Sequence, residues 1–465
     1  MTNTDKIQAL FDSQLVAVNI GPRLFGEALE KQNVRLFKWI GAPLRAEISR
    51  CRICFLSWGC SRDERRASMK ILVCNVGSTS LKFKLYDMPA CTVLSQGKAE
   101  RVGSLDDAIF QYENLQTGSL VNEEKAAIPD YKVGIRRYLD CLTDPQTGVL
   151  SSVSQIERVG YKTTLSKNHF GDHELTDEVI EGMRAWLPLA TLHNTGYLQA
   201  IGVMREALPD AIFLGCFETG FHRDIPLERR LYGVPYEWYE RYGVQRLGYH
   251  SASHGYIADV LGEIGGGSYR AISCHLGGSS SVCAIQDGKS IDTSFGMSLQ
   301  SGLIHAARVG DMDCDLYEFL RHEGLSDAQI HEGFEKKGGL LGISGVSSDL
   351  RYIEAAAKDG NERARLAIEV FVSGIVHCIG SFYMDLGGLD YLVFTAGIGE
   401  NSDFLRRRVC EKLGVLGVVL DNAKNEACHG TLLELTGQDS KVRVFAIPTN
   451  EELGIARRTY DYVRP

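Results

Sequence analysis

Residues 70–87 follow a hydrophobic pattern that predicts two strands joined by a tight turn. The apolar run at positions 71–74 is typical of a buried strand. Small and turn-forming residues occupy most of positions 75–80. Leu81, Phe83 and Leu85 then alternate with polar neighbours, which places apolar side chains on one face of a second strand. The pattern therefore predicts a β-hairpin.

A similar pattern returns at residues 271–288. Cys74, Gly77, Ser80 and Asp87 of the first stretch recur as Cys274, Gly277, Ser280 and Asp287. A turn of glycine and small hydroxyl residues allows backbone and side-chain donors to approach a phosphate closely. Lys82 adds a positive charge just after the first turn. The repetition predicts two related halves that each offer a phosphate loop to one site.

Periodicity predicts further elements on both sides of the first hairpin. Before it, apolar runs at residues 15–20 and 34–39 flank a helical pattern at 22–33, which predicts a small βαβ fragment. After Asp106 the pattern is loop-rich. The remaining expected elements are helices at 133–142, 177–186, 198–204 and 363–384, strands at 211–217 and 391–394, and a final helix after the capping-box pair Thr449 and Glu452. Because residues 363–384 are apolar on most faces, we expect that helix to be largely buried.

Composition limits the class of protein. The 465 residues, of which 44% are hydrophobic, are enough for two domains with their own cores. A net charge of −9 without a basic block argues against nucleic-acid binding. No secretory signal and no apolar run long enough to span a bilayer stand out, so we expect a cytoplasmic protein with reduced thiols and no membrane partner. Cys51, Cys54 and Cys60 form the one cysteine cluster, but it lacks the second ligand pair of a zinc site.

Several separate motifs, in order, make the chain resemble the acetate and propionate kinase family from about residue 69 to the C-terminus. That family belongs to the superfamily of sugar kinases, Hsp70 and actin. The resemblance implies an α/β fold with two duplicated ribonuclease H-like domains and a nucleotide cleft between them. It places domain I at residues 69–219 plus 451–465 and domain II at 220–450. Residues 1–68 lie outside it, as an N-terminal extension.

The resemblance also implies catalytic residues. Glu218, at the end of the predicted strand 211–217, stands where the family has its catalytic aspartate. His250 and Arg308 match residues that stabilise the transition state, where donors to the phosphoryl oxygens are needed. His254 is expected to support the loop around His250.

Arg158 matches the family's substrate-binding arginine, since a guanidinium fork can hold two carboxylate oxygens. The family motif Arg-Val-Val-His-Gly-Gly then becomes residues 158–163, in which Gly160 replaces a bulky pocket residue. Leu299 in place of proline and Tyr249 in place of phenylalanine lie at or near the same acyl pocket in the family. A more open pocket is therefore expected to accept propionate, or a slightly larger or more polar acid, at least as well as acetate.

The resemblance implies three nucleotide-binding stretches in addition to Lys82. They are His275, Leu276, Gly277, Gly278 and Ser279; Asp349, Leu350 and Arg351; and Gly397, Ile398, Gly399, Glu400 and Asn401 before a helix expected from Ser402. The family has asparagine where this chain has Gly278. Asn75 and Glu451 match positions associated with Mg²⁺ or Mn²⁺, and both offer the oxygen ligands that a hard cation prefers.

The resulting hypothesis is reversible, ATP-dependent phosphorylation of a short-chain carboxylic acid, acetate or propionate, by a homodimeric enzyme. Two alternatives stay open because Glu218, Gly278 and the lost His-Gly-Gly depart from the family. One is a weakly catalytic or non-catalytic nucleotide-binding relative with a sensing or scaffolding role. The other is a kinase for a different carboxylic acid.

Overall fold

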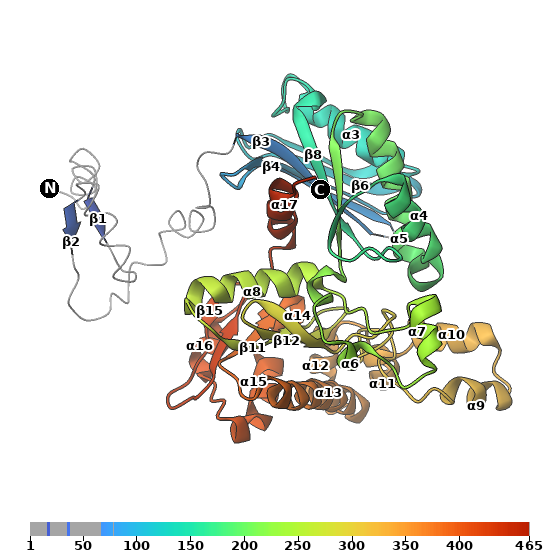
Figure 1. Cartoon of the computed structure of the whole chain (residues 1–465), viewed down its shortest axis with the longest axis vertical. Helices are drawn as coiled ribbons and strands as arrows, with labels where there is room; N and C mark the ends of the chain where they lie inside the picture. The colour runs from blue at the N-terminus through green and yellow to red at the C-terminus, as the bar shows by residue number, and fades with distance from the viewer. Residues whose placement is uncertain (1–15, 19–34, 38–66, 78, 465) are drawn as a thin grey trace. The chain divides into compact units, whose positions relative to one another are not determined.

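The computed structural model describes residues 67–77 and 79–464, without the side chains of 191–193, and two short strands before them. The chain divides into the compact units Met1–Arg62 and Asp63–Pro465. In the first unit, β1 (Val16–Val18) and β2 (Arg35–Phe37) pair in parallel, as the predicted βαβ fragment requires (Figure 1). The helix predicted between them and Cys51, Cys54 and Cys60 lie outside the described residues.

The second unit contains an eight-stranded mixed sheet with the strand order β7-β6-β5-β4-β3-β8-β10-β9. Its strands are β3 (Met69–Val76), β4 (Ser80–Met88), β5 (Thr92–Glu100), β6 (Ser104–Asn114), β7 (Leu120–Ile128), β8 (Ile156–Thr163), β9 (Asp172–Glu174) and β10 (Ile212–Phe217). The antiparallel pair β3–β4 confirms the first predicted hairpin. The loop-rich prediction after Asp106 is wrong, because β6 and β7 form an antiparallel pair there whose outward positions are polar.

A six-stranded sheet follows, with the order β13-β12-β11-β14-β16-β15. Its strands are β11 (Arg270–His275), β12 (Ser281–Gln286), β13 (Lys289–Thr293), β14 (Tyr391–Thr395), β15 (Leu433–Glu434) and β16 (Arg443–Ala446). The two sheets share a pattern of three parallel strands that begins at the first strand of each hairpin. In the first sheet β3 pairs with β8 and β8 with β10; in the second β11 pairs with β14 and β14 with β16. The shared order supports the duplication that the repeated hairpin predicted.

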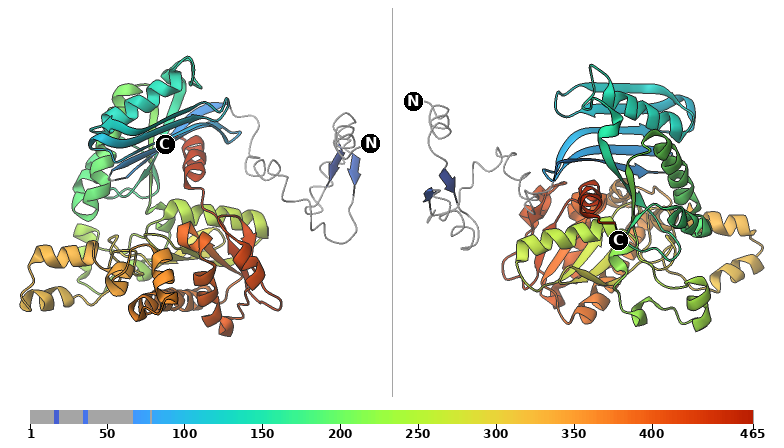
Figure 2. Two further views of the ribbon diagram at one scale, coloured as in Figure 1. Left: turned by 180° about the vertical axis from the view of Figure 1, so that it is seen from behind. Right: turned by 45° about the horizontal axis from the view of Figure 1, so that its top comes forward.

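Helices lie around the two sheets (Figure 2). They are α3 (Tyr131–Thr143), α4 (Asp177–Ala185), α5 (Leu187–Ala207), α6 (Leu227–Arg230), α7 (Tyr236–Tyr242), α8 (Ser251–Gly265), α9 (Leu316–His322), α10 (Asp327–Glu335), α11 (Gly339–Ser344), α12 (Leu350–Lys358), α13 (Glu362–Leu386), α14 (Ala396–Asn401), α15 (Asp403–Lys412), α16 (Asn422–Ala427) and α17 (Glu451–Asp461). Helices α9 and α10 project to one side and pack on each other (Figure 2). One apolar core joins α3, α4 and α5 to the first sheet, and another joins α12, α13 and α15 to the second.

The last helix, α17, returns to the first sheet. Ile455, Ala456 and Tyr460 pack against Ile71 and Val73 of β3. The side chain of Asn450 caps the helix by accepting a hydrogen bond from the backbone of Leu453, so the cap lies one residue after the predicted Thr449. The C-terminal residues therefore complete the core of the first sheet, as predicted.

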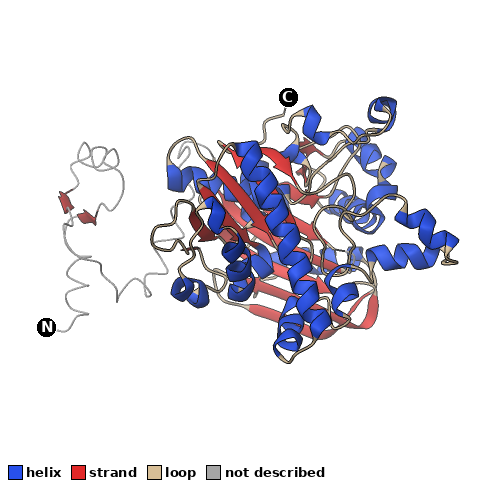
Figure 3. Cartoon of the chain, turned by 90° about the horizontal axis from the view of Figure 1, so that it is seen from below, coloured by secondary structure: helices blue, strands red, loops and turns tan. Residues whose placement is uncertain are grey.

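Helix α13 packs one face across β11 and β12 (Figure 3). Its opposite face is exposed, with exposed fractions of 55% for Leu366, 37% for Val370 and 77% for Met384, so the prediction of a largely buried helix is wrong. By length and composition alone, this one helix of the described part could also cross a membrane, contrary to the expectation that no such run exists. Nine described cysteines are free thiols, whereas Cys91 is disulfide-bonded, which departs from the expectation of reduced thiols.

Candidate functional site

The ends of two neighbouring strands bring opposite charges together. β8 and β10 run parallel, so Lys162 near the end of β8 and Glu218 just after β10 lie at the same edge of the sheet. Lys162 Nζ lies 3.6 Å from Glu218 Oε2 and 2.6 Å from Oε2 of Glu451, the first residue of α17. One ammonium therefore joins two carboxylates from different elements.

Burial and mutual attraction shift the pKa values of these three groups. Burial raises the pKa of Glu218, although the charge of Lys162 opposes this shift. Burial would also raise the pKa of Glu451, but Lys162 and His275 hold it below its usual value. Burial alone would lower the pKa of Lys162, yet the two carboxylates raise it well above its usual value. The lysine is therefore charged at neutral pH.

His250 lies beside Glu218. The backbone N–H and hydroxyl of Ser251 both donate to the main-chain carbonyl of Glu218, and the N–H of Ala252 donates to Glu218 Oε1 at 3.3 Å. The backbone of His250 has a φ of 59°, a left-handed conformation that residues other than glycine rarely adopt. Its ring stacks on His275 with 3.9 Å between centroids. Two of the predicted catalytic residues thus meet the start of the second phosphate hairpin.

Two of the predicted nucleotide stretches are in direct contact. Leu276 follows the end of β11, and its carbonyl accepts hydrogen bonds from Ile398 N at 2.8 Å and Gly399 N at 3.1 Å. Residues 396–401 form the one-turn helix α14 rather than a bare turn, and α15 begins after its cap Ser402, as predicted. A Cβ atom added to Gly278 or Gly397 would meet no atom within 4 Å. The backbone at both positions therefore leaves room for a ligand to approach.

The loop of Arg308 contacts the glycine turn, and the third nucleotide stretch begins α12. Ala306 N donates to Gly278 O at 3.0 Å, which ties the loop of Arg308 to the glycine turn, and Arg308 Nη1 donates to Leu299 O at 2.6 Å. Asp349 caps α12 and forms an ion pair with Arg351. The residue between them, Leu350, is buried in the second core.

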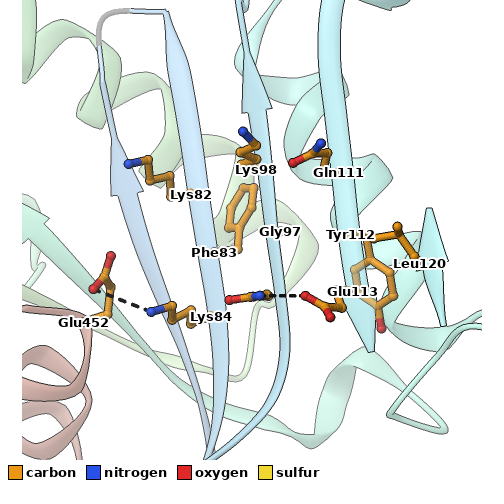
Figure 4. A pocket seen from close by; sticks show the side chains of 11 residues that line it. Lys82, Phe83, Lys84, Gly97, Lys98, Gln111, Tyr112, Glu113, Leu120 and Glu452 are labelled. Atoms are coloured by element: carbon orange, nitrogen blue, oxygen red, sulfur yellow. Dashed lines mark hydrogen bonds and ion pairs between the residues drawn. The ribbon is translucent and has the colours of Figure 1, made fainter. Parts of the chain in front are cut away.

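The first hairpin places Asn75 opposite Lys82. Asn75 Oδ1 accepts a hydrogen bond from Tyr197 at 3.2 Å. Lys82 lines a cavity of about 270 Å³ on the exposed face of β4–β6, where Lys84 lies 3.8 Å from Glu452 of α17 (Figure 4). Within the described part of the chain, the side chain of Lys82 forms no hydrogen bond or ion pair with the side chain of another predicted site residue. The cavity also contains Lys98, Gln96, Gln111 and Glu113.

Arg158 does not join the site. Its Nη1 donates to the carbonyls of Thr459, Tyr460 and Tyr462 at 2.7, 3.2 and 2.8 Å, so it binds the C-terminal end of α17. Alternate residues of β8 share one face, and α17 covers Arg158 while Lys162, four residues later, reaches the carboxylates. Sequence reasoning missed Lys162. The alternation of β8 and the predicted strand end at Glu218 were the signals that could have found it.

Gly160 does not open a pocket either. A Cβ atom at this position would lie 2.3 Å from Thr459 Oγ1 and 2.9 Å from Ile455 Cγ2, because α17 packs directly on the strand. The inference of an enlarged acyl pocket from Gly160 is therefore wrong. The glycine permits close packing between the helix and the sheet.

A separate apolar cluster adjoins the catalytic candidates. The ring of its buried member Phe295 lies 5.2 Å from the ring of His250. Leu299, whose carbonyl binds Arg308, packs against the same cluster, and the hydroxyl of Tyr249 donates to Met297 O at 2.6 Å. The other buried members are Leu165, Trp186, Ala190 and Leu247. This cluster, rather than the surroundings of Gly160, is the apolar surface beside His250.

The donors at the strand ends suit a hard cation and phosphate oxygens. Asn75 and Glu451 offer oxygen atoms, and Mg²⁺ typically takes one or two carboxylates together with waters and substrate phosphates. Among the described residues, the buried hydroxyls of Thr163, Thr219 and Ser279 find no hydrogen-bond partner. Among the residues with described side chains, no group of three or more His, Cys, Asp or Glu could hold a metal. The oxygen donors present fit an ion that is shared with a phosphorylated ligand.

Comparison with known proteins gives a consistent result. Residues 70–457 match the model of the acetokinase family. The acetate kinase of Halothermothrix orenii is 40% identical over 396 residues, which cover 84% of this chain and 98% of that protein. The acetate kinase of Dictyoglomus thermophilum is 42% identical over the same length and shares of both chains.

Solved structures agree with the fold. The crystal structure of Porphyromonas gingivalis acetate kinase has a TM-score of 0.77 at 37% identity and covers 84% of this chain and 99% of its own. A propionate kinase from Francisella tularensis has a TM-score of 0.78 at 29% identity, with 85% and 100% covered. The chain belongs to the acetokinase family.

Proposed function

We propose that this protein is an ATP-dependent kinase that phosphorylates a short-chain carboxylic acid, acetate or propionate, to an acyl phosphate in a reversible reaction. The observation that carries the proposal is the contact of Lys162 with Glu218 and Glu451 beside His250. A cation, two carboxylates and a histidine thus converge next to the glycine turns. Phosphoryl transfer depends mainly on such positioning and charge.

The reaction needs no strong base, because the acid is already ionised at neutral pH. Its carboxylate oxygen bonds to the γ-phosphorus of ATP, the bond from that phosphorus to the bridging oxygen breaks, and ADP leaves with the electron pair. Glu218 serves to position groups rather than to remove a proton. Arg308 and His250 donate hydrogen bonds to the equatorial oxygens as their charge develops.

We assign the binding of the acid's carboxylate to Lys162 instead of Arg158. Lys162 is charged and lies at the strand end beside Glu218, whereas Arg158 is held by three carbonyls of α17. A lysine offers a compact charge with rotatable donors, so it fixes the orientation of a carboxylate less strictly than an arginine fork does.

The nucleotide is assigned to the two glycine turns in contact at Leu276, with Lys82 and residues 349–351 around it. Asn75 and Glu451 would hold Mg²⁺, which Mn²⁺ could replace because both take oxygen ligands. When bound, the metal neutralises charge on the β- and γ-phosphates of ATP. Glu451 would then exchange part of its contact with Lys162 for the metal.

We further propose that the fold divides into domain I, residues 69–219 plus 451–465, and domain II, residues 220–450, after a separate extension at 1–68. The separate cores of the two sheets and the packing of α17 on the first sheet support this division.

The exposed apolar face of α13, formed by Leu366, Val370 and Met384, supports a homodimer that buries this face. Sedimentation of the parent and of Val370→Glu tests the dimer. A parent that sediments as a monomer at micromolar concentration would rule it out.

Purified protein incubated with ATP, Mg²⁺ and acetate, propionate or butyrate tests the activity, with the acyl phosphate trapped by hydroxylamine and ADP measured in parallel. We expect acyl hydroxamate from acetate or propionate in a one-to-one ratio with ADP. Binding of ATP without any product would favour a sensing or scaffolding relative, the alternative suggested by Glu218, Gly278 and the lost His-Gly-Gly. Product only with other acids would favour a kinase of different specificity.

A further inference from the structure

A line of alternating histidine and serine side chains leads from His250 into the core. Ser281 Oγ lies 2.8 Å from His250 Nδ1 and 2.8 Å from His254 Nε2. On its other side, His254 Nδ1 lies 3.0 Å from Ser273 Oγ. Ser281, His254 and Ser273 are all fully buried, so solvent does not replace any of these hydrogen bonds.

Ser281 couples the protonation of the two rings. Its hydroxyl carries one proton, so it donates to one imidazole and accepts from the other. If His250 donated from Nδ1, Ser281 would donate to His254 Nε2 and His254 would donate from Nδ1 to Ser273. The hydroxyl proton of Ser273, which is fully buried, would then have no acceptor among the described residues, and an unsatisfied buried donor is costly.

The opposite direction satisfies the donors of all three fully buried residues and leaves only the N–H of the half-buried His250 free. Ser273 donates to His254 Nδ1, His254 Nε2–H donates to Ser281, and Ser281 donates to His250 Nδ1. His250 then carries its proton on Nε2, the nitrogen that has no hydrogen bond within the described part of the protein. Burial and the neighbouring His275 and His254 lower the pKa of His250 well below its usual value, so the ring is neutral in this arrangement.

We propose that Ser273, His254 and Ser281 are positioning residues that hold His250 as the neutral tautomer with its proton on Nε2, ready to donate to the phosphoryl group. This inference rests on the proposed role of His250 in phosphoryl transfer. The left-handed backbone of His250 and its stack on His275 fix the ring in place. The line Ser273–His254–Ser281, here called the relay, fixes the direction of its hydrogen bonds.

A second hydroxyl–histidine pair provides a matched control. Ser290 Oγ lies 2.8 Å from His222 Nδ1, and His222 Nε2 donates to Tyr249 O at 2.8 Å. Ser290 and His222 are buried like Ser273, His254 and Ser281, and the His222 ring packs edge-on against His254 with 5.9 Å between centroids. The hydrogen bonds of the Ser290 hydroxyl go to His222 and Cys283, not to Ser281 or Ser273. Ser290→Ala therefore removes an equivalent buried hydrogen bond next to the relay but none of the bonds that lead to His250.

The first test reads the tautomer directly. In ¹⁵N-histidine-labelled protein without ligands, we expect the His250 signals of an imidazole protonated on Nε2, with Nδ1 accepting a hydrogen bond. A His250 proton on Nδ1 would overturn the proposal. This measurement needs no catalytic activity, so it separates failure of the relay from failure of the proposed function.

The second test uses variants and steady-state kinetics with ATP, Mg²⁺ and acetate. Ser281→Ala and His254→Leu should lower kcat about tenfold or more, with less than about threefold change in either KM, because the missing interaction acts on the transition state. His254→Gln should recover most of the loss, since an amide N–H can donate to Ser281. Ser290→Ala should keep kcat near the parent value.

Equal losses of kcat in Ser281→Ala and Ser290→Ala would contradict the relay and indicate a general packing effect. If Ser281→Ala does not fold, the contrast between His254→Gln and His254→Leu decides: similar kcat values in both would overturn the proposal.

Discussion

Lys162 and Arg158 lie on the same face of β8, four residues apart, yet their surroundings differ. Arg158 donates to backbone carbonyls at the end of a helix, where a cation also interacts favourably with the helix dipole. Lys162 lies between two buried carboxylates. Arg158, held by helix carbonyls, therefore contributes to stability. Lys162, at the strand ends between two carboxylates, can instead bind the carboxylate of a ligand.

Replacing each of these two residues by methionine should separate an effect on stability from an effect on substrate binding. Lys162→Met should raise the KM for acetate by at least about tenfold, because it removes one partner of the charge pair assigned to Lys162 and the acetate carboxylate, and such a truncation costs about 2–5 kcal/mol. Arg158→Met should lower the melting temperature and leave the KM for acetate within about twofold of the parent. Initial-rate kinetics and thermal denaturation of both variants test this. An acetate KM that rises only in Arg158→Met would return the substrate role to Arg158.

Arg308 is expected to act on the transition state rather than on the binding of ATP. Arg308→Ala should lower kcat by about 10²-fold or more, with a much smaller change in the KM for ATP, because its hydrogen bonds are assigned to charge that develops in the transition state. His250→Ala should show the same division between kcat and KM. Both are measured with saturating acetate and varied ATP. Near-normal turnover of either variant would remove that residue from the catalytic group.

At the scale of elements, α17 connects the structure of the first sheet to the site. Its first residue, Glu451, contacts Lys162, its middle packs on β3, and its last carbonyls bind Arg158. The helix approaches β8 so closely that position 160 has no room for a side chain. Packing along the helix therefore determines where Glu451 lies relative to Lys162.

Gly160→Val should consequently destabilise the protein by about 1–3 kcal/mol, as expected for overpacking a core. It should leave the ratio of kcat/KM for propionate and acetate within about twofold of the parent, because the glycine does not line the acyl pocket. Gly202→Ala on α5 is a suitable control, since its Cβ atom would meet nothing within 4 Å. A large change in acid preference with Gly160→Val would restore the pocket hypothesis.

For the whole molecule, hydrophobic periodicity predicted the strands and the duplication, whereas the residue types at the site did not predict all of its contacts. The repeated hairpin and the apolar runs that became β10 and β14 are local patterns, so the sequence predicted them and the duplication. The edge strand β7 and its neighbour β6 escaped prediction because their outward positions are polar. The partner of Arg158 could not be predicted, since it lies some three hundred residues away in α17 and depends on how the helix docks.

The sequence also could not predict how many imidazoles share the second sheet's core. His222, His254, His275 and His305 are buried, and the ring of His254 packs against the rings of His222, His250 and His275. Hydroxyl and backbone partners satisfy these rings in their neutral form. Folding therefore requires that this group stays uncharged.

This requirement predicts a loss of stability in mild acid. Burial lowers the pKa of His222 to about 4, of His275 to about 4 and of His305 to about 3, from 6.5 in the unfolded chain. Between pH 6.5 and 4 the unfolded chain binds more protons, so the free energy of unfolding should fall as the pH falls, by about 1.4 kcal/mol per pH unit for each histidine. The raised pKa of Glu218 acts in the opposite direction and offsets part of the loss.

Urea denaturation at pH 7.5, 6.5, 5.5 and 4.5 measures this dependence. His222→Gln, whose amide can replace both hydrogen bonds of the ring to Tyr249 and Ser290, should reduce the slope below pH 6.5 by about one histidine's share, 1.4 kcal/mol per pH unit. If His222→Gln leaves the slope between pH 6.5 and 4.5 unchanged, His222 is protonated in the folded protein over that range. The neutral tautomer assigned to His250 would then lose its basis as well, because the same buried group surrounds it.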